Sequence, residues 1–493
     1  MLEKQPNIQY YAVKIITILV LLLSACGKPG NDFLSIGQAA NIFPSYDGTV
    51  IPYNIAPLNF MILEEGDRYT VRFAIAGKDS FDVSSKGTVS IPLRKWKKML
   101  ESNRGEKMEV SIFVKKSSGW TRYSPLRFTI APQPVDPWLA YRLIEPGYES
   151  WSRMGIYQRC LENFKETTII ANHLTDGSCM NCHSFNNNNP QTMLFHVRQQ
   201  HAGTIFLKDG KISKINTKAP DMISAGVYPR WHPDGRYVAF SVNTTRQEFH
   251  MAHTNKVEVY DMASDLMIFD TQTNTVFTNS LICSPNYFET YPEWSPDGKY
   301  LYFCSVAARP MPDEYDSLRY DLLRIEFDAS TGQFGERVDT LVSSAITEKS
   351  VALPRISPDG KYLVFCMSNY GTFPIWHREN DLYVMDLETK KIRNMEEINS
   401  NQSDSYHSWS SNGRWMIFGS RRMDGTFTRP YLCYFDTEGN AHTPFLLPQK
   451  DPRHYIFSTK SYNIPEFITG KVTVSPHEFA KAVKGKAIDV RTR

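Results

Sequence analysis

Residues 228–240 read YPRWHPDGRYVAF, and residues 291–303 read YPEWSPDGKYLYF. The same layout returns as LPRISPDGKYLVF at 353–365 and, more loosely, as YHSWSSNGRWMIF at 406–418. Each copy predicts a strand, a tight turn and a second strand, because proline presets the first turn dihedral and glycine supplies the positive φ. The turn aspartates Asp234, Asp297 and Asp359 are therefore expected to make local hydrogen bonds and not to act in catalysis.

A further apolar strand follows each copy, at 265–270, 321–328, 380–386 and 431–436. Four strands per unit, repeated every roughly 50 to 60 residues, are typical of a β-propeller blade. The copies resemble the TolB-type, WD-like propeller repeat over roughly residues 178–448. Residues 183–198 have the same hairpin layout, with an asparagine run in place of the turn. The resemblance implies an all-β propeller; six blades are favoured, the sixth joining 455–467 to chain from 138–175, and seven are the alternative.

Residues 42–131 alternate between apolar and polar side chains with a period of two, in several short strands separated by Gly-containing turns. This pattern predicts an immunoglobulin- or fibronectin-like β-sandwich. A helix is expected at 93–102, with its lysines facing solvent. The expected domains are a lipoprotein signal peptide (1–25), a lipid-anchored tether (26–41), the sandwich (42–131), a linker or connector (132–177), the propeller (178–475) and a C-terminal tail (476–493).

The N-terminal apolar run at 15–23 is too short for a permanent membrane-spanning helix and has the length of a signal-peptide core. It ends in Leu23-Ser24-Ala25-Cys26, which resembles a bacterial lipobox. That resemblance implies lipidation of Cys26 and a cell-envelope protein anchored to a membrane through its lipid. Because Asp does not follow Cys26, the outer membrane is the expected address; the periplasmic and surface faces both stay open.

Composition restricts the function further. The net charge is only +3, with basic and acidic residues interspersed, so a nucleic-acid partner is not expected. The chain contains no Gly-x-Ser-x-Gly elbow, phosphate-binding loop or His-Glu-x-x-His motif. No hydrolase or transferase signature is present, and electron transfer is the activity left open.

One short motif stands apart from the repeats. Residues 179–183 read CMNCH, which resembles the attachment motif of a c-type haem. The resemblance implies thioether bonds from Cys179 and Cys182 and iron ligation by His183, with one covalent haem. Candidates for the second axial ligand are Met193, His196, His201 and His173.

The same atoms allow other chemistry. Cys179 and Cys182 could form a disulfide, and His183 with another histidine such as His196 could bind a metal. His250 and His253, three residues apart in an insertion of the second blade, are a weaker ligand pair and are expected to lie on a solvated loop. Two hypotheses follow: a binding or scaffold lipoprotein for a protein, peptide or glycan partner at the propeller face, or a haem redox protein.

Overall fold

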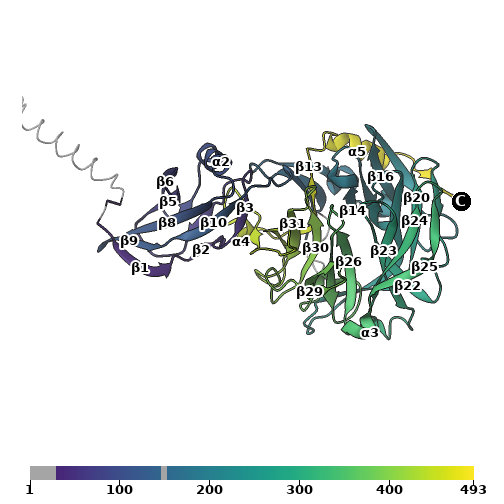
Figure 1. The fold of residues 1–493 in the computed structure, drawn as a ribbon. Helices are drawn as coiled ribbons and strands as arrows, with labels where there is room; N and C mark the ends of the chain where they lie inside the picture. Colours follow the sequence, from purple (N-terminus) through teal and green to yellow (C-terminus); the bar gives the residue numbers. More distant parts are fainter. Residues whose placement is uncertain (1–28, 31, 146–152) are drawn as a thin grey trace, which may run out of the picture.

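The structure is a computed structural model that describes residues 29–30, 32–145 and 153–493. A smaller β domain and a larger ring of β-sheets form one elongated molecule (Figure 1). The expected signal peptide and the expected lipidation site, Cys26, lie outside the described residues. Within the described part, no helix has the length and hydropathy needed to cross a membrane.

The smaller domain is a β-sandwich made of two sheets. The larger sheet contains β1 (Leu34–Ala39), β3 (Val50–Pro52), β5 (Arg68–Ile75), β6 (Ser80–Ser85), β8 (Lys107–Lys116), β9 (Gly119–Ser124) and β10 (Leu126–Ala131). The smaller sheet contains β2 (Ile42–Phe43), β4 (Phe60–Ile62) and β7 (Thr88–Val89). Strand β1 comes from residues expected to form the tether, and it pairs in parallel with β9.

The predicted helix is present as α2 (Leu93–Ser102). Trp96, Met99 and Leu100 are buried against the sandwich, as expected for an apolar stripe with helical spacing. Lys95 and Lys98 are exposed, so the lysines form a solvated face.

Six sheets follow, and each is described from its innermost strand outward. The first is β14 (Met180–Phe185), β15 (Met193–Val197), β16 (Gly203–Lys208) and β17 (Lys211–Asn216); the second is β18 (Val227–Trp231), β19 (Tyr237–Phe249), β20 (Val257–Asp270) and β21 (Thr275–Phe277). The third is β22 (Tyr287–Trp294), β23 (Tyr300–Ala307), β24 (Asp321–Asp328) and β25 (Gln333–Val342); the fourth is β26 (Ser350–Ile356), β27 (Tyr362–Ser368), β28 (Asp381–Asp386) and β29 (Ile392–Asn394). The fifth is β30 (Asp404–Trp409), β31 (Trp415–Ser420), β32 (Arg429–Tyr434) and β33 (Phe445–Leu446).

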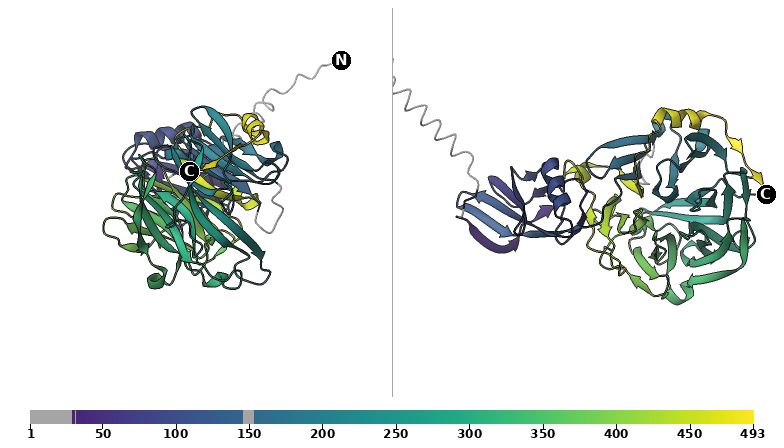
Figure 2. Two further views of the ribbon diagram at one scale, coloured as in Figure 1. Left: turned by 90° about the vertical axis from the view of Figure 1, so that its right-hand side faces the viewer. Right: turned by 45° about the horizontal axis from the view of Figure 1, so that its top comes forward.

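The last sheet joins the two ends of the ring. Its innermost strand is β34 (Ser461–Ile468), followed by β11 (Trp138–Ile144), β12 (Gly155–Cys160) and β13 (Glu166–Ala171). The antiparallel pairing of β11 with β34 is the expected contact between early and late chain. The innermost strands β14, β18, β22, β26, β30 and β34 contact one another in a closed cycle, so the sheets surround a common axis (Figure 2).

The predicted hairpins are confirmed, because the first two strands of each repeat pair in antiparallel register. Their turn aspartates do accept local hydrogen bonds. The Asp234 and Asp297 carboxylates each accept the backbone N–H two residues ahead, at 2.7 and 3.1 Å. Asp359 does the same at 3.2 Å. These residues fix the turns.

One residue of every innermost strand has a positive φ. These residues are Cys182 (52°), Tyr228 (48°), Tyr291 (51°), Leu353 (54°), Tyr406 (49°) and Ile464 (50°). The register of each strand shifts at the same point, which identifies a β-bulge. A bulge bends the strand and changes the direction of its side chains. All six innermost strands therefore present equivalent residues to the axis.

The last residues of the chain are ordered on the outside of the ring. Helix α5 (Pro476–Lys484) begins with a capping box between Ser475 and Glu478. Strands β35 (Ile488–Asp489) and β36 (Arg491–Thr492) then pair with the outer strands β17 and β21. The stretch expected to be a tail thus connects the first two sheets.

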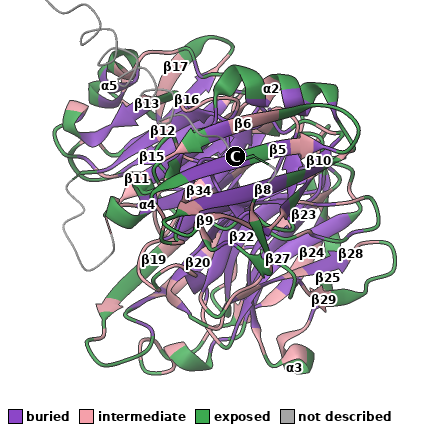
Figure 3. Cartoon of the chain, turned by 90° about the vertical axis from the view of Figure 1, so that its left-hand side faces the viewer, coloured by how far each residue is buried: buried purple, intermediate pink, exposed green. Residues whose placement is uncertain are grey.

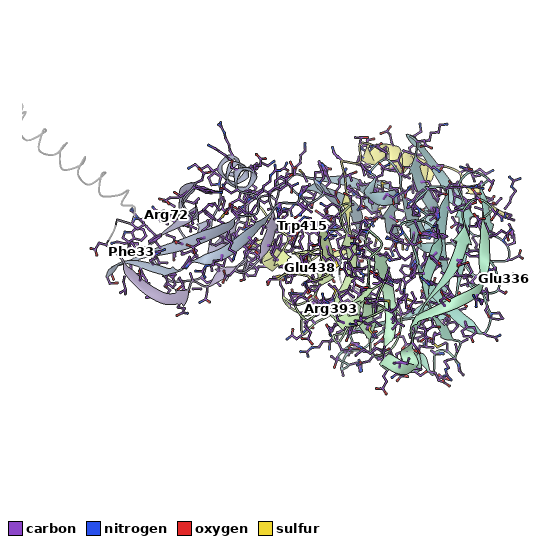
Figure 4. All side chains as sticks on the ribbon, in the orientation of Figure 1. Phe33, Arg72, Glu336, Arg393, Trp415 and Glu438 are labelled. Carbon is purple, nitrogen blue, oxygen red and sulfur yellow. The ribbon has the colours of Figure 1, made fainter. Side chains whose placement is uncertain are left out.

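The sandwich packs directly on the ring. The ring of Tyr46 meets the edge of the Phe445 ring, and the Asn59 side chain donates to the Lys450 carbonyl at 2.9 Å. A single core cluster runs from the sandwich into the third, fourth and fifth sheets. Figure 3 shows strands that are mainly buried and loops that are mainly exposed, and Figure 4 shows Trp415 and Glu438 on the side of the ring that faces the sandwich.

Substitution of two phenylalanines tests whether the ring closes through β34. Phe467 on β34 is fully buried, whereas Phe457 in the short helix α4 (His454–Phe457) is 72% exposed. We expect Phe467→Ala to lower the free energy of unfolding by about 3 to 5 kcal/mol, because it leaves a cavity between the two ends of the ring. Phe457→Ala should change it by less than about 0.5 kcal/mol. Guanidinium unfolding followed by circular dichroism measures both; equal effects would contradict closure through β34.

Candidate functional site

The CMNCH motif lies at the start of the innermost strand of the first sheet. Cys182 and His183 belong to β14 and are 3% and 2% exposed, whereas Cys179 precedes the strand and is partly exposed. All three residues are in the described part of the chain, and both cysteines are free thiols. Cys182 occupies the bulge position that tyrosine, leucine or isoleucine occupies in the other sheets.

The surroundings of the motif bear on the haem hypothesis. Burial raises the pKa of the Cys182 thiol and lowers that of His183 to about 3, so the imidazole is neutral. The His183 ring meets the edge of Phe185, and β14 contacts β15, β18 and β34. In this arrangement a porphyrin bound to Cys182 and His183 would have to displace the packed neighbours of β14.

The two axial-ligand candidates on β15 point in different directions. Met193 lies opposite Phe185 and is fully buried, while His196 lies opposite Asn181. They are three residues apart on one strand, so their side chains project from opposite faces of the sheet. His196 Nδ1 lies 3.2 Å from Thr204 Oγ1. The two side chains do not converge on one position.

The remaining histidine candidates have other surroundings. His201 Nε2 lies 2.8 Å from a carboxylate oxygen of Asp176. The rings of His250 and His253 are 5.7 Å apart in the loop between β19 and β20. Within the described residues, no cluster of three or more His, Cys, Asp or Glu side chains could hold a metal ion.

The residues two positions after each bulge form a different site. They are Ser184, Arg230, Glu293, Arg355, Ser408 and Glu466, one from each innermost strand. The last five line a cavity of about 380 Å³ on the axis, at the end where the Pro-Asp-Gly turns lie. We call this space the axial cavity and these five residues the polar ring. The cavity has a size found for sites of small ligands.

Charges in the polar ring are unequally paired. Glu293 Oε2 lies 2.6 Å from Arg230 Nε and 3.2 Å from Arg355 Nη1, so one carboxylate bridges two guanidinium groups. These side chains are only 10% to 22% exposed. Burial and the neighbouring Arg230 lower the pKa of Arg355 to about 10, and Arg355 is still charged at neutral pH.

Glu466 faces the same cavity, and no ion pair is formed by its carboxylate with any residue that the structure describes. It is 7% exposed, and its Oε1 accepts the Phe185 backbone N–H at 3.2 Å. Burial raises the pKa of the Glu466 carboxyl to about 7, against the opposing effect of Arg230. Its charge therefore changes near neutral pH.

Aromatic side chains form the wall of the axial cavity above the polar ring. Trp231, Trp294 and Trp409 follow Arg230, Glu293 and Ser408 in sequence and line the cavity. Each indole N–H donates to a carbonyl of the preceding sheet: Trp231 to Ser184 at 3.3 Å, Trp294 to Arg230 at 3.1 Å and Trp409 to Arg355 at 3.2 Å. These bonds hold the indoles between neighbouring sheets.

Sequence reasoning did not identify the polar ring, although the repeats contain its signal. Arg230, Glu293, Arg355 and Ser408 occupy one position of the repeated motif, directly before Trp or Ile. Three of these four residues are charged, although the position lies inside a strand expected to be buried. This was the sequence signal for a polar site on the axis. Glu466 belongs to a strand without the turn motif, so it could be added only from the structure.

A second cavity of about 750 Å³ is lined by His253, Asn255, Lys349, Tyr370 and Arg378, among others. Beside it, Glu258 on β20 binds the fourth sheet. Its carboxylate accepts from Tyr370 Oη at 2.7 Å and lies 3.0 Å from His377 Nε2. This buried contact attaches the extended β19–β20 hairpin of the second sheet to the loop between β27 and β28 of the fourth sheet, which is a structural role.

No family model and no curated protein matches the chain. Solved structures that resemble it include an oligogalacturonate lyase in complex with manganese (12% identity, TM-score 0.36, covering 64% of this chain and 75% of that one). Others are the tricorn protease (12%, TM-score 0.35, 70% and 34%) and prolyl oligopeptidase B from Galerina marginata (11%, TM-score 0.35, 76% and 52%). Likeness at these TM-scores and identities carries no conclusion about this chain.

The bridging role of Glu293 can be measured. Glu293→Gln leaves two guanidinium groups close together without their shared anion, and we expect the free energy of unfolding to fall by about 3 kcal/mol. Asp339→Asn is the matched control, because Asp339 pairs with Arg324 at 3.0 Å but is 59% exposed. That change should cost less than about 1 kcal/mol. Denaturant unfolding of both variants measures the two losses. A loss for Glu293→Gln no larger than that for Asp339→Asn would contradict the bridge.

Proposed function

We propose that this protein is a lipid-anchored binding protein of the cell envelope, whose axial cavity receives a segment of a protein or peptide partner. The observation that carries the proposal is the polar ring with its tryptophan wall. Buried charged groups that retain free hydrogen-bonding capacity, in a concave site between fixed aromatic rings, suit a ligand that brings both charge and apolar surface. The cavity volume suits a short segment or chain end and not a folded surface.

The arrangement of the domains supports the anchor. Figure 4 labels Phe33 at the end of the sandwich that is farthest from the ring. Lipid on Cys26, a few residues before Phe33, would attach that end to the membrane. The sandwich would then act as a spacer, and the axial cavity would stay accessible to a partner. An outer-membrane address remains part of this proposal.

A second candidate function is the haem redox protein. The observation in its favour is that, among the described residues, neither His183 nitrogen has a hydrogen-bond partner of good geometry, although the backbone of Ile464 is near. A neutral imidazole beside two free thiols has the donor types of a c-type haem site. The packing of β14 favours the binding protein.

The axial cavity can be blocked by a residue that the repeats already use. Ile356 has the position held by Trp231, Trp294 and Trp409 in other sheets, so we expect Ile356→Trp to fold and to narrow the cavity. A bead-displayed library of random hexapeptides should yield binders whose affinity falls at least about tenfold in this variant. The control is Ile392→Trp, at an exposed site on β29 of the same sheet.

Fluorescence anisotropy of the labelled peptides gives the affinities. Equal binding by wild type and Ile356→Trp would show that peptides bind elsewhere. If no peptide binds, the peptide proposal is wrong; binding of an oligosaccharide panel instead would identify a glycan partner.

The haem candidate has its own test. As a binding protein, the chain purified from an exporting, haem-loading host should be colourless and have the mass of the polypeptide plus its lipid. A Soret band with the added mass of one haem, both lost in Cys179→Ala/Cys182→Ala, would replace the binding function by a redox function. A visible spectrum and an intact mass are sufficient.

A further inference from the structure

The polar ring contains two guanidinium groups, and both pair with the same carboxylate. Glu293 forms ion pairs with both Arg230 and Arg355. Within the described residues, Glu466 has no ion pair with either guanidinium group, although it faces the same cavity. Two guanidinium charges are thus compensated at short range by one carboxylate.

Both arginines also keep unused donors. Arg355 uses Nη1 for the Pro354 carbonyl, at 2.6 Å, and for Glu293. In the described part of the chain, its Nε and Nη2 groups donate to nothing, and they form the edge that binds a carboxylate through two parallel hydrogen bonds. Arg230 donates to Glu293 through Nε and Nη2, and its Nη1 likewise lacks an acceptor among those residues.

We propose that the group bound at the polar ring is a carboxylate of the partner segment, held by Arg355 and Arg230. It is either a C-terminal carboxylate or an Asp or Glu side chain. This inference rests on the proposed function and names the chemistry that the axial cavity selects. An amine would meet the two guanidinium groups and be repelled, whereas a carboxylate together with Glu293 balances the two guanidinium charges when Glu466 is protonated.

A pH dependence follows from Glu466. The charged groups that face it are Arg230 on β18, Glu293 on β22 and Arg355 on β26, while β14 and β30 contribute Ser184 and Ser408 at the equivalent positions. When Glu466 is ionised, it competes with the ligand for the arginines. When it is protonated, the competing charge disappears and its O–H can donate. Ligand affinity should therefore rise as the pH falls through about 7.

Three matched libraries of N-acetylated hexapeptides separate the possible ligand groups. The first has a free C-terminal carboxylate and no Asp or Glu, the second has an amidated C-terminus and contains Asp and Glu, and the third is amidated without acidic residues. We expect wild type to bind members of the first or the second library, which identifies the source of the carboxylate, and at least about tenfold more weakly members of the third.

The outcomes distinguish this inference from the proposed function. If the third library binds as tightly as the others and Ile356→Trp still abolishes binding, the axial cavity binds peptides but does not select a carboxylate. If no library binds, the proposed function itself fails. The first result overturns the carboxylate inference, and the second overturns the proposed binding function.

Two substitutions test the residues. Arg355→Gln should weaken binding of the selected peptides at least about tenfold, whereas the control Arg324→Gln, on β24 away from the axis, should not. Glu466→Gln copies the protonated carboxyl, so it should bind as wild type does at pH 6 and lose the fall in affinity between pH 6 and 8.

Circular dichroism of each variant confirms the fold, and Arg230→Gln is the second variant should Arg355→Gln not fold. Wild-type affinity for the selected peptides in Arg355→Gln, or an unchanged pH dependence in Glu466→Gln, would overturn the inference.

Discussion

The β-bulge in each innermost strand is the constraint on which the axial site depends. A residue with positive φ, such as Cys182 or Tyr228, shifts the register between the first two strands of its sheet. The side-chain period of a strand is two, so the residue two positions later lies in an equivalent place in every sheet. Six repetitions of one local irregularity create a ring of side chains around the axis, which a regular strand would not place there.

The ring of side chains exists only because the sheets close. Strand β34, which contains Glu466, comes from the C-terminal part of the chain and pairs with β11 in the closing sheet. Its partner strands come from residues directly after the sandwich, and Asp136 in that connection accepts hydrogen bonds from the Ser411 backbone N–H and hydroxyl at 2.7 and 2.6 Å. Hydrogen bonds and strand pairing therefore join the connection after the sandwich to the closing sheet and to Ser411 at the wall of the axial cavity.

The hairpins and the helix at 93–102 could be predicted from sequence because their signals are local. The Pro-Asp-Gly turns fix strand pairing over a few residues, and the spacing of Trp96, Met99 and Leu100 fixes the helix face. The polar ring could not be assembled in this way. Consecutive members lie 53 to 63 residues apart in the sequence, their identities differ from sheet to sheet, and only closure brings them together. The CMNCH motif is a different case. Its five residues resemble a haem attachment motif, whereas the position of Cys182 at the β-bulge of β14 is not visible in a short motif.

The buried charges at the axis indicate a binding site and not a core that only stabilises the ring. Ion pairs taken out of water contribute little net stability, and apolar residues of similar volume would pack the axis equally well. At the bulge positions themselves, two residues before the polar ring, the fourth and the closing sheets have apolar side chains, Leu353 and Ile464. Four charged residues of the polar ring instead line the axial cavity: Arg230, Glu293, Arg355 and Glu466. A cluster that costs desolvation, leaves guanidinium donors unused and faces a fixed aromatic wall has the organisation expected of a site completed by its ligand.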